Sequence, residues 1–482
     1  MSNADRFIAR HARSIREEDR FRFHVAAPVG WINDPNGFSF FDGKIHLFYQ
    51  SNPYATHWGP MHWGHVASDD FVKWTRLPVA LTPGAGKGVL GCFSGSAVTH
   101  DGKHALVYTR AGLFRQVQCL ATSTDGIEYV EYERNPVVDG TMLPRDSSKA
   151  DFRDPKVWFE DGAFHMLVAN RNASDPYAKL LLYRSSDLMK WTYVGIVLRN
   201  GEALRPKLGV MLECPDLVRF PAGDAILVSP QDIPGHRNRH GTACVVGRFD
   251  PKTGVFSDWN FEAIAEIDLG LDFYAPQTTV MPDGRVVMVA WMQSWNRRPA
   301  YASTGFAGAL TFPRELSLKD GRLHQWPVRE LEWYHRNPLD LTVDLPAGRD
   351  FQDPRLSGFA QDIDISFTPG PGRTGITVFC DAEGNGLSID YDDGRVVLDR
   401  RAVAGPLLPT DETANFVTAD CPLLDGKVRI RLILDRYSCE VFLADGRTTL
   451  TATAFPAPER ENVWFSSDVP VAITVHKRDV VR

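Results

Sequence analysis

The 482-residue sequence predicts an all-β fold, a five-bladed β-propeller followed by a C-terminal β-sandwich. Two observations lead to this prediction. First, a glycine-containing turn followed by a short apolar segment occurs five times, at intervals of 59 to 61 residues. Second, this period stops near residue 330, and a different series of alternating β-like segments follows. A fixed period with several strands in each repeat is typical of propeller blades.

Each repeat contains the signature of a β-hairpin. A β-like segment, a turn and an apolar segment follow one another, and four of the five turns contain Asp-Gly. Asp-Gly between two apolar runs favours the tight turn of a hairpin. An irregular β-sandwich is the alternative, but the nearly constant spacing disfavours it. The turn glycines are Gly43, Gly102, Gly162, Gly223 and Gly284.

The end of the repeats sets the domain boundaries that we predict. Residues 1–335 form the propeller, 336–349 a linker and 350–482 the sandwich. Segments such as GLSIDYDDGRVVLDRR combine alternating apolar residues with Asp-Gly turns, which is typical of an antiparallel sandwich. Between the two patterns, PVRELEWYHRN is expected to form a short helix or a bridging segment. We assign no chemistry to the sandwich.

Composition excludes several classes of function. The net charge of −7 and the pI near 6.1 argue against a nucleic-acid or anionic-membrane partner. No apolar run is long enough for a transmembrane helix, and the N-terminus lacks the apolar core of a signal peptide. The seven cysteines are an odd number without CxxC spacing, which favours reduced thiols and a cytoplasmic location.

The segment WINDPNG, residues 31–37, has the residues of a β-turn, so Asp34 has a purely structural explanation. The repeat suggests a second role. Asp34, Asp154 and Glu213 each lie eight to ten residues before a turn glycine, on the first strand of a blade. First strands line the channel of a propeller, and the end of that channel is a natural pocket. We therefore expect these three acids to meet at one mouth of the channel.

Three acids in one pocket suit glycoside hydrolysis. That reaction needs one carboxylate as nucleophile and one carboxylic acid to protonate the leaving group. Carboxyl groups crowded together raise the pKa of at least one member, so that one stays protonated while another is ionised. Aromatic faces and hydrogen-bonding side chains suited to a sugar lie nearby in the sequence, namely Trp31, Trp58, Trp63, Phe93, Tyr274, Trp295, Asn33, Gln50, Ser94 and Arg153.

These residues also carry a family resemblance. In order along the chain stand WINDPNG, FYQSNP, WG, FSGS, FRDP, EC, FYAPQT and LTFPREL. In this respect the chain resembles glycoside hydrolase family 32, the β-fructosidases. The resemblance covers nearly the whole chain and extends to LDRYSCEVFLADG in the expected sandwich.

The resemblance implies a retaining mechanism on a fructofuranosyl unit. Asp34 would be the nucleophile, Glu213 the general acid and then the base that activates water. Asp154 would hold fructose hydroxyls and stabilise the transition state without transferring a proton. The fructose pocket would be lined by Trp31, Asn33, Gln50, Trp58, Phe93, Ser94 and Arg153, with Tyr274 and Trp295 beside it.

Four functions remain to be compared at this point. The first is hydrolysis of sucrose, sucrose 6-phosphate or short fructooligosaccharides, among which the sequence does not choose. The second is fructosyl transfer to another sugar with the same three acids. The third is a non-catalytic carbohydrate-binding propeller, which the presence of all three acids disfavours. The fourth is a five-bladed glycosidase for arabinose or xylose, which would not carry these motifs together.

Two further segments are ambiguous. HWGPMHWGH contains His57, His62 and His65, but these do not share a strand face and no Cys or carboxylate joins them, so we expect no metal and no cofactor. PGHRNRHG, residues 234–241, is either a solvated basic loop or a contact for a phosphate or leaving group. A homo-oligomer is compatible with the sequence, with the sandwich as the contact.

Overall fold

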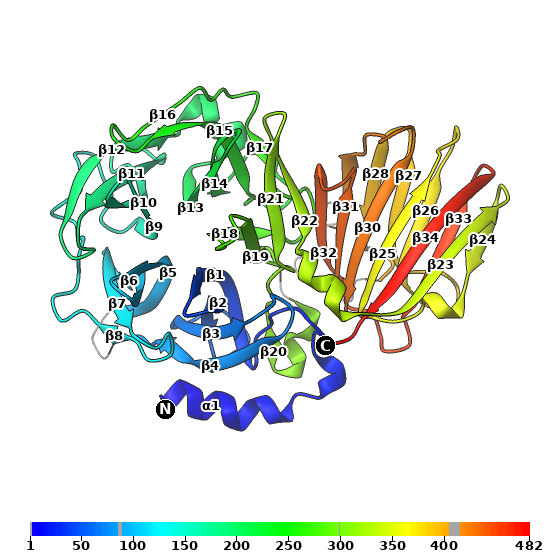
Figure 1. Ribbon diagram of the computed structural model, residues 1–482, viewed down its shortest axis with the longest axis horizontal. Helices are drawn as coiled ribbons and strands as arrows, with labels where there is room; N and C mark the ends of the chain where they lie inside the picture. The colour runs from blue at the N-terminus through cyan, green and yellow to red at the C-terminus, as the bar shows by residue number, and fades with distance from the viewer. Residues whose placement is uncertain (1, 85–88, 298, 404–414) are drawn as a thin grey trace.

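The structure is a computed structural model that describes residues 2–84, 89–297, 299–403 and 415–482. Within these ranges the strands form seven sheets, and the first five in chain order surround a common axis (Figure 1). The first strands of these five sheets contact one another in a closed ring, β1–β5–β9–β13–β18 and back to β1. The second part of the chain is a sandwich of the two remaining sheets. The predicted fold class is therefore confirmed.

The propeller sheets contain four or five strands each. The first comprises β1 (Gly30–Phe41), β2 (Lys44–Asn52), β3 (His62–Ser68), β4 (Trp74–Leu81) and β20 (Phe306–Ala307). The second and third comprise β5 (Val89–His100), β6 (Lys103–Gly112), β7 (Gln116–Ser123) and β8 (Val130–Glu131), and β9 (Phe152–Glu160), β10 (Ala163–Arg171), β11 (Ala178–Ser185) and β12 (Trp191–Arg199). The last two comprise β13 (Met211–Phe220), β14 (Gly223–Gln231), β15 (Ala243–Asp250), β16 (Val255–Ser257) and β17 (Ala265–Glu266), and β18 (Tyr274–Val280), β19 (Val286–Trp291), β21 (Arg314–Lys319) and β22 (Arg322–Pro327).

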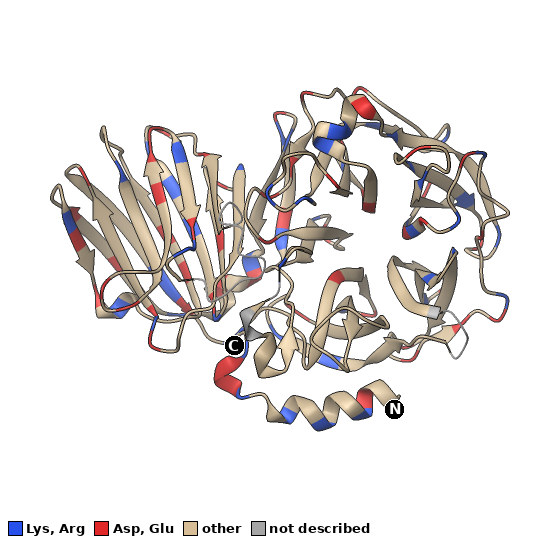
Figure 2. Cartoon of the chain, turned by 180° about the vertical axis from the view of Figure 1, so that it is seen from behind, with Lys and Arg blue, Asp and Glu red and all other residues tan. Residues whose placement is uncertain are grey.

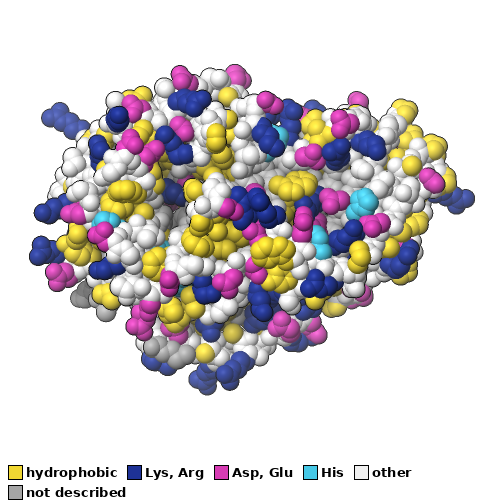
Figure 3. All heavy atoms as spheres, viewed as in Figure 1, with side chains coloured by type: hydrophobic (Ala, Val, Ile, Leu, Met, Phe, Trp, Pro, Cys, Tyr) yellow, Lys and Arg dark blue, Asp and Glu magenta, His cyan; other side chains and the backbone are white. Residues whose placement is uncertain are grey.

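Helices are few and short in the described ranges. The α-helices are α1 (Asn3–His11) and α2 (Arg205–Leu208). The 3₁₀ turns are Ala12–Ser14, Glu17–Asp19, Glu202–Leu204, Ala300–Thr304, Arg329–Tyr334 and Pro354–Leu356. None of the helices described is long and apolar enough to cross a membrane. Charged side chains of both signs are interspersed over the face shown in Figure 3 and do not gather into one large patch.

Asp-Gly turns connect the first two strands of four blades, as predicted, and in three of them both residues have positive φ. At Asp42-Gly43 the φ angles are 48° and 74°, and the pairs at residues 101–102 and 161–162 have similar values. Positive φ at both central residues defines the type I′ turn, whose twist matches that of the paired strands. The local sequence therefore sets the hairpins from which the blades are built.

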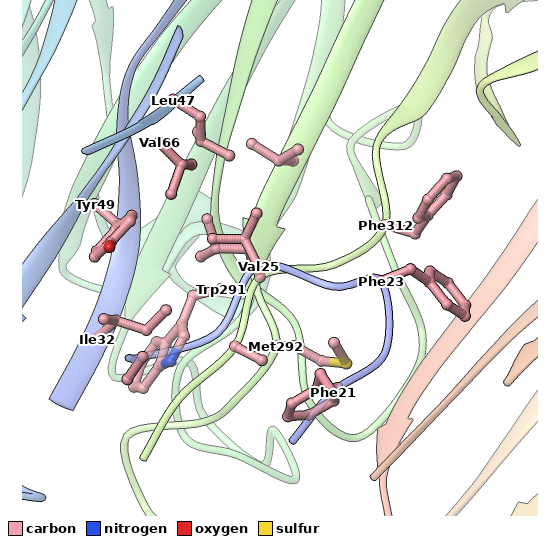
Figure 4. Close-up of a cluster of buried hydrophobic side chains, with 14 of the residues drawn as sticks. Phe21, Phe23, Val25, Ile32, Leu47, Tyr49, Val66, Trp291, Met292 and Phe312 are labelled. Atoms are coloured by element: carbon pink, nitrogen blue, oxygen red, sulfur yellow. The ribbon is translucent and has the colours of Figure 1, made fainter. Parts of the chain in front are cut away.

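The N-terminal segment and the last blade close the ring. Strand β20 pairs in parallel with β1 through Gly30–Phe306 and Trp31–Ala307. Side chains from residues 21–25, β1, β2, β3 and β19 then form one buried cluster, in which Phe23 and Phe312 pack edge to face (Figure 4). The strand that carries Asp34 is thus held by residues from both ends of the propeller.

The sandwich consists of two six-stranded sheets. One contains β23 (His335–Leu345), β34 (Val471–Val480), β25 (Gln361–Phe367), β30 (Val428–Asp435), β31 (Ser438–Leu443) and β32 (Thr448–Thr453). The other contains β24 (Arg349–Gln352), β33 (Asn462–Ser467), β26 (Thr374–Cys380), β27 (Leu387–Asp392), β28 (Arg395–Asp399) and β29 (Phe416–Asp420). The buried cluster between the two sheets is apolar, with side chains such as Ile365, Val378, Leu432 and Phe465.

The structure differs from the sequence prediction at residues 336–349. These residues do not form a free linker, because most of them belong to β23, which pairs with β34. Alternation of Leu339, Leu341, Val343 and Leu345 explains the strand, since every second side chain faces the sandwich core. The chain instead crosses between the two domains at the 3₁₀ turn Arg329–Tyr334, within the segment expected to bridge them.

Candidate active site

The first strand of every blade is irregular near its start. Each shows a register shift in its pairing with the second strand, as between Ile32 and Pro35 or between Glu213 and Asp216. Four of the five irregularities contain proline and the fifth contains glycine, at Pro35, Gly95, Pro155, Pro215 and Pro276. Such bulges bend a strand and re-aim its side chains, and proline cannot donate to the ladder. The bulges turn the preceding side chains toward the axis.

The register also corrects the alignment of the repeats. The residues that directly precede the bulge proline or glycine are Asp34, Ser94, Asp154, Cys214 and Ala275, so Glu213 lies one position earlier than its expected counterparts. The three acids converge despite this offset, since Glu213 binds Arg153, the neighbour of Asp154, and Cys214 contacts both Asp34 and Asp154. Acidic residues lie at inner strand ends around the axis in Figure 2.

Asp34 lies at the centre of a polar network. Its side chain is buried and accepts hydrogen bonds from Ser94 Oγ at 2.7 Å and Asn33 Nδ2 at 3.0 Å. Burial and the charge of Glu213 raise the pKa of Asp34, whereas the Ser94 and Asn33 hydrogen bonds lower it. Trp31 Nε1 donates to Asn33 at 2.8 Å and fixes the orientation of that amide.

Asp154 and Asp34 meet at Cys214. The Cys214 thiol is 3.6 Å from Asp34 Oδ2 and 3.8 Å from Asp154 Oδ2, and its amide N–H donates to Asp154 at 3.0 Å. Both Asp154 and Cys214 have positive φ, at 64° and 49°. Burial and the charge of Glu213 raise the pKa of Asp154 to about 7, although Arg153 opposes the shift.

Glu213 accepts hydrogen bonds from three side chains. Arg153 Nε and Nη2 bind Oε1 at 3.0 and 2.9 Å. Gln231 Nε2 and the Tyr274 hydroxyl bind Oε2 at 2.7 and 2.8 Å. Every oxygen of this carboxylate therefore has a partner. None of the side chains that donate to Glu213 also donates to Asp34. The two carboxyl groups therefore lie in different local environments.

The structure places the remaining expected pocket residues around these acids, with different exposure. Gln50 is buried and donates to Cys92 O at 2.9 Å. Trp58 is 41% exposed and its ring meets Phe93 edge to face at 5.9 Å. Trp295 stacks near Trp31 at 6.5 Å. Trp58 is thus the exposed ring at the edge of the site, whereas Trp31 and Tyr274 are as buried as Gln50.

Sequence reasoning missed two partners of the acids. Cys214 was part of a recognised motif, but a thiol has no obvious contact with a sugar, so it was not assigned to the site. Gln231 ends the second strand of its blade, where no local pattern marks it. The register of β14 against β13 would have indicated it, because Gln231 pairs with Met211, close to Glu213.

The basic loop of residues 234–241 lies beside the site. Arg237 is engaged, because its guanidinium binds Glu266 at 2.6 Å and Gly270 O at 2.9 Å. Arg239 has an exposed side chain, paired with Asp232. The His240 ring lies 6.5 Å from that of Tyr274. Arg237 is therefore held by contacts within the fold, whereas Arg239 lies near the surface.

The site thus contains two buried carboxyl groups, Asp34 and Asp154, and a third, Glu213, that is bound by Arg153, with aromatic rings beside them. A glycoside hydrolase needs a set of carboxyl groups of this kind. Comparisons with known proteins make this specific. The family models for the N-terminal and C-terminal domains of glycosyl hydrolases family 32 match residues 24–327 and 337–477. The chain therefore belongs to glycosyl hydrolase family 32, and it is an enzyme that cleaves β-fructofuranosides.

Similar proteins support this family over the full length. A sucrose-6-phosphate hydrolase of Escherichia coli is 34% identical over 477 residues, covering 94% of this chain and 93% of the relative. A raffinose invertase of the same species is 36% identical over 454 residues, covering 90% and 89%. The structure of a β-fructofuranosidase from Bombyx mori superposes with a TM-score of 0.85 at 29% identity, covering 99% and 97% of the two chains.

Proposed function

We propose that the chain hydrolyses β-fructofuranosides with retention of configuration. Asp34 attacks the anomeric carbon, Glu213 protonates the leaving-group oxygen and then activates water, and Asp154 holds fructose hydroxyls. The observation that carries this proposal is the convergence of the three carboxyl groups from three blades, with separate donors for Asp34 and Glu213. Retention requires the carboxyl groups of Asp34 and Glu213 to stand about 5–5.5 Å apart.

Isosteric replacement of the two reacting acids tests these roles. We expect Asp34→Asn and Glu213→Gln each to lower kcat on sucrose by about three or more orders of magnitude, because each removes a group that forms or breaks a bond. Circular dichroism and thermal unfolding of both variants should stay close to wild type. Turnover near the wild-type rate by either variant would contradict the assignment.

The stereochemical course needs a trapped product. Reaction in the presence of methanol should give the methyl β-fructofuranoside, because two displacements at the same carbon restore the starting configuration. Nuclear magnetic resonance of the glycoside reads this directly, since a glycoside does not mutarotate. The α-anomer would show a single inverting displacement and reject Asp34 as nucleophile.

We propose sucrose and sucrose 6-phosphate as substrates, supported by relatives named for the latter. Arg239, although it pairs with Asp232, is the more accessible of the two arginines for a phosphate, since its side chain is 67% exposed and that of Arg237 is 17% exposed and bound to Glu266. Arg239→Ala should lower kcat/KM for sucrose 6-phosphate about tenfold and leave sucrose unchanged, with Arg237→Ala as the comparison. Rates on sucrose, sucrose 6-phosphate, 1-kestose and inulin measure the preference. An equal loss on sucrose and its phosphate would reject a phosphate contact.

A cytoplasmic location is also our proposal. It is supported by the seven cysteines, all of which are free thiols and six of which are buried. Reduced thiols are typical of proteins in a reducing compartment.

A further inference from the structure

A short segment of the propeller lies along an edge strand of the sandwich. Leu269 N donates to Thr449 O at 2.9 Å, and Leu271 N and Asp272 N donate to Thr451 O at 2.7 and 3.0 Å. Gly270 lies so close to Thr451 that a Cβ there would be 2.0 Å from its nitrogen. Residues 268–272, which we call the docking segment, are thus fixed to β32 of the sandwich.

Asp272 ends the docking segment and collects donors from both domains. Its Oδ2 accepts from Arg400 Nη1 and from Thr453 N and Oγ1 at 2.7 and 2.8 Å, all in the sandwich. Its Oδ1 accepts from Arg297 Nη1 at 2.8 Å, in the propeller. Asp272 and Arg400 have no exposed side-chain surface. A buried carboxylate of this kind needs its cations, because an unpaired buried charge is strongly destabilising.

The active site follows Asp272 by two residues. The Tyr274 hydroxyl donates to Glu213 Oε2 at 2.8 Å, and Ala275 N donates to Ser229 Oγ at 3.0 Å. Arg297, which binds Asp272, provides a second connection to the active site. Its Nη2 binds Asn238 Oδ1, and Trp295 lies two residues before it in the sequence. The position of the Tyr274 hydroxyl therefore depends on where the sandwich holds Asp272.

We infer that Arg400, in the sandwich, is a positioning residue for Glu213, acting through Asp272 and Tyr274 during cleavage of the glycosidic bond. The inference rests on the proposed role of Glu213 as general acid. An error of about 1 Å in the placement of a reacting group costs on the order of a hundredfold in rate. The sandwich, to which the sequence analysis assigned no chemistry, thereby affects how well Glu213 protonates the leaving group.

Dependence on the leaving group separates this role from simple loss of stability. Arg400→Gln should lower kcat on sucrose about 10- to 100-fold with little change in KM. For 4-nitrophenyl β-fructofuranoside, whose leaving group departs without protonation, kcat/KM reports only the steps up to its release, and the loss of kcat/KM should stay below about threefold. Arg400→Lys keeps the charge beside Asp272 and should recover most of the sucrose activity. Equal losses on both substrates, or no loss on either, would overturn the inference.

Milder and matched variants keep the test informative if Arg400→Gln folds poorly. Thr453→Val removes one donor to Asp272 and should show the same substrate dependence at smaller size. Arg431→Gln breaks a buried pair with Asp362 inside the sandwich and should change both substrates equally. Because Arg400 acts through Tyr274, Tyr274→Phe combined with Arg400→Gln should lose less than the sum of the two single effects. Additive losses would also overturn the inference.

Glu213→Gln distinguishes failure of the inference from failure of the proposed function. If this variant loses kcat/KM on sucrose but keeps kcat/KM on the nitrophenyl substrate, Glu213 is the acid, and the Arg400 result stands or falls by itself. Its kcat on the nitrophenyl substrate should still fall, because Glu213 also activates the water that hydrolyses the intermediate. Equal losses of kcat/KM on both substrates would show that the acid role of Glu213 is wrong, whatever Arg400 does.

Discussion

At the scale of single residues, the site is built from opposing influences on the same carboxyl group. Asp34 must be ionised to attack, yet burial and Glu213 raise its pKa. Ser94 acts against them with a 2.7 Å hydrogen bond to Oδ2. A hydrogen bond to a charged group contributes about 1.5–3 kcal/mol. Ser94 is therefore expected to set the lowest pH at which Asp34 is still ionised and the enzyme is active.

Ser94→Ala should move the acid limb of the kcat/KM profile to higher pH. Loss of the donor raises the pKa of Asp34 further, so less of it is ionised at a given acidic pH. At about pH 5 we expect kcat/KM to fall about ten- to a hundredfold, with a smaller loss at pH 8.

Ser39→Ala is the control for that profile. Ser39 is as buried as Ser94 and lies on β1 with Asp34, but its hydroxyl contacts Gly37 O and His104 Nε2 and no carboxyl group. The same displacement of the acid limb in both variants would contradict the role assigned to Ser94.

The sequence predicted the three acids but not all of their surroundings. Asp34, Asp154 and Glu213 were expected to converge because each stands eight to ten residues before a turn glycine that recurs along the chain. Gln231 was missed because it reaches Glu213 from the far end of a neighbouring strand, and such cross-strand contacts depend on register. The phosphate interpretation of Arg237 loses support for a similar reason, since its partner Glu266 lies 29 residues away.

At the scale of secondary-structure elements, the glycines of one hairpin have two different functions. Gly102 lies in the β5–β6 turn with φ of 70° and open space where a Cβ would stand. Gly95 lies in the bulge beside Ser94, where a Cβ would be 2.1 Å from Val107 O and 2.7 Å from Tyr108 Cα. The first needs glycine for its backbone angle, and the second for the close approach of two strands.

Alanine at these two positions should therefore separate stability from activity. Gly102→Ala should cost about 1 kcal/mol in the free energy of unfolding, with kcat/KM retained. Gly95→Ala should displace β5 and with it Ser94, so that kcat/KM falls at least tenfold. Urea unfolding and sucrose hydrolysis measure the two effects. Full activity of folded Gly95→Ala would show that the bulge does not position Ser94.

The elements that were predicted best are those with local causes. Asp-Gly turns and apolar alternation are readable within ten residues, and they located the hairpins of the blades. The N-terminal helix α1 was not predicted, although Ser2 and Asp5 form a capping box at its start. Its position depends on a distant contact, because Asp5 also accepts from Val79 N at 2.9 Å.

At the scale of the whole molecule, buried charges join the propeller to the sandwich. His24 lies between Asp435 and Glu440 of the sandwich, at 2.7 and 2.8 Å, and its side chain has no exposed surface. These carboxylates raise the pKa of His24 to about 9 despite burial. Arg314, equally buried, binds Glu440 and also Asp268 at the start of the docking segment.

Because His24 is charged, the free energy of unfolding depends on pH in the alkaline range. Its pKa is higher in the folded than in the unfolded chain, so its contribution is fully present below about pH 6.5 and is lost as pH rises through about 9. The shift corresponds to about 3 kcal/mol. Replacement by glutamine should therefore destabilise the protein at pH 6 by about that amount, and the difference from wild type should narrow toward pH 9–10.

Chemical denaturation at several pH values measures this difference. His476→Gln is the control, because His476 pairs with Asp340 at the surface and should give a small difference at every pH. A wild-type advantage over His24→Gln that stays constant from pH 6 to pH 10 would contradict the prediction.

The closed ring has a consequence for the order in which the chain is made. Asp34 leaves the ribosome early, but its strand is completed by Phe306 and Ala307, and the adjoining residues 22–24 bind Asp435. Tyr274 in turn follows a segment that rests on residues 449–453. A nascent or truncated chain that ends before β32 contains every reacting group, together with Phe306, Ala307 and Asp435, but lacks residues 449–453, on which the segment before Tyr274 rests. Catalytic competence should arrive only with the last tenth of synthesis.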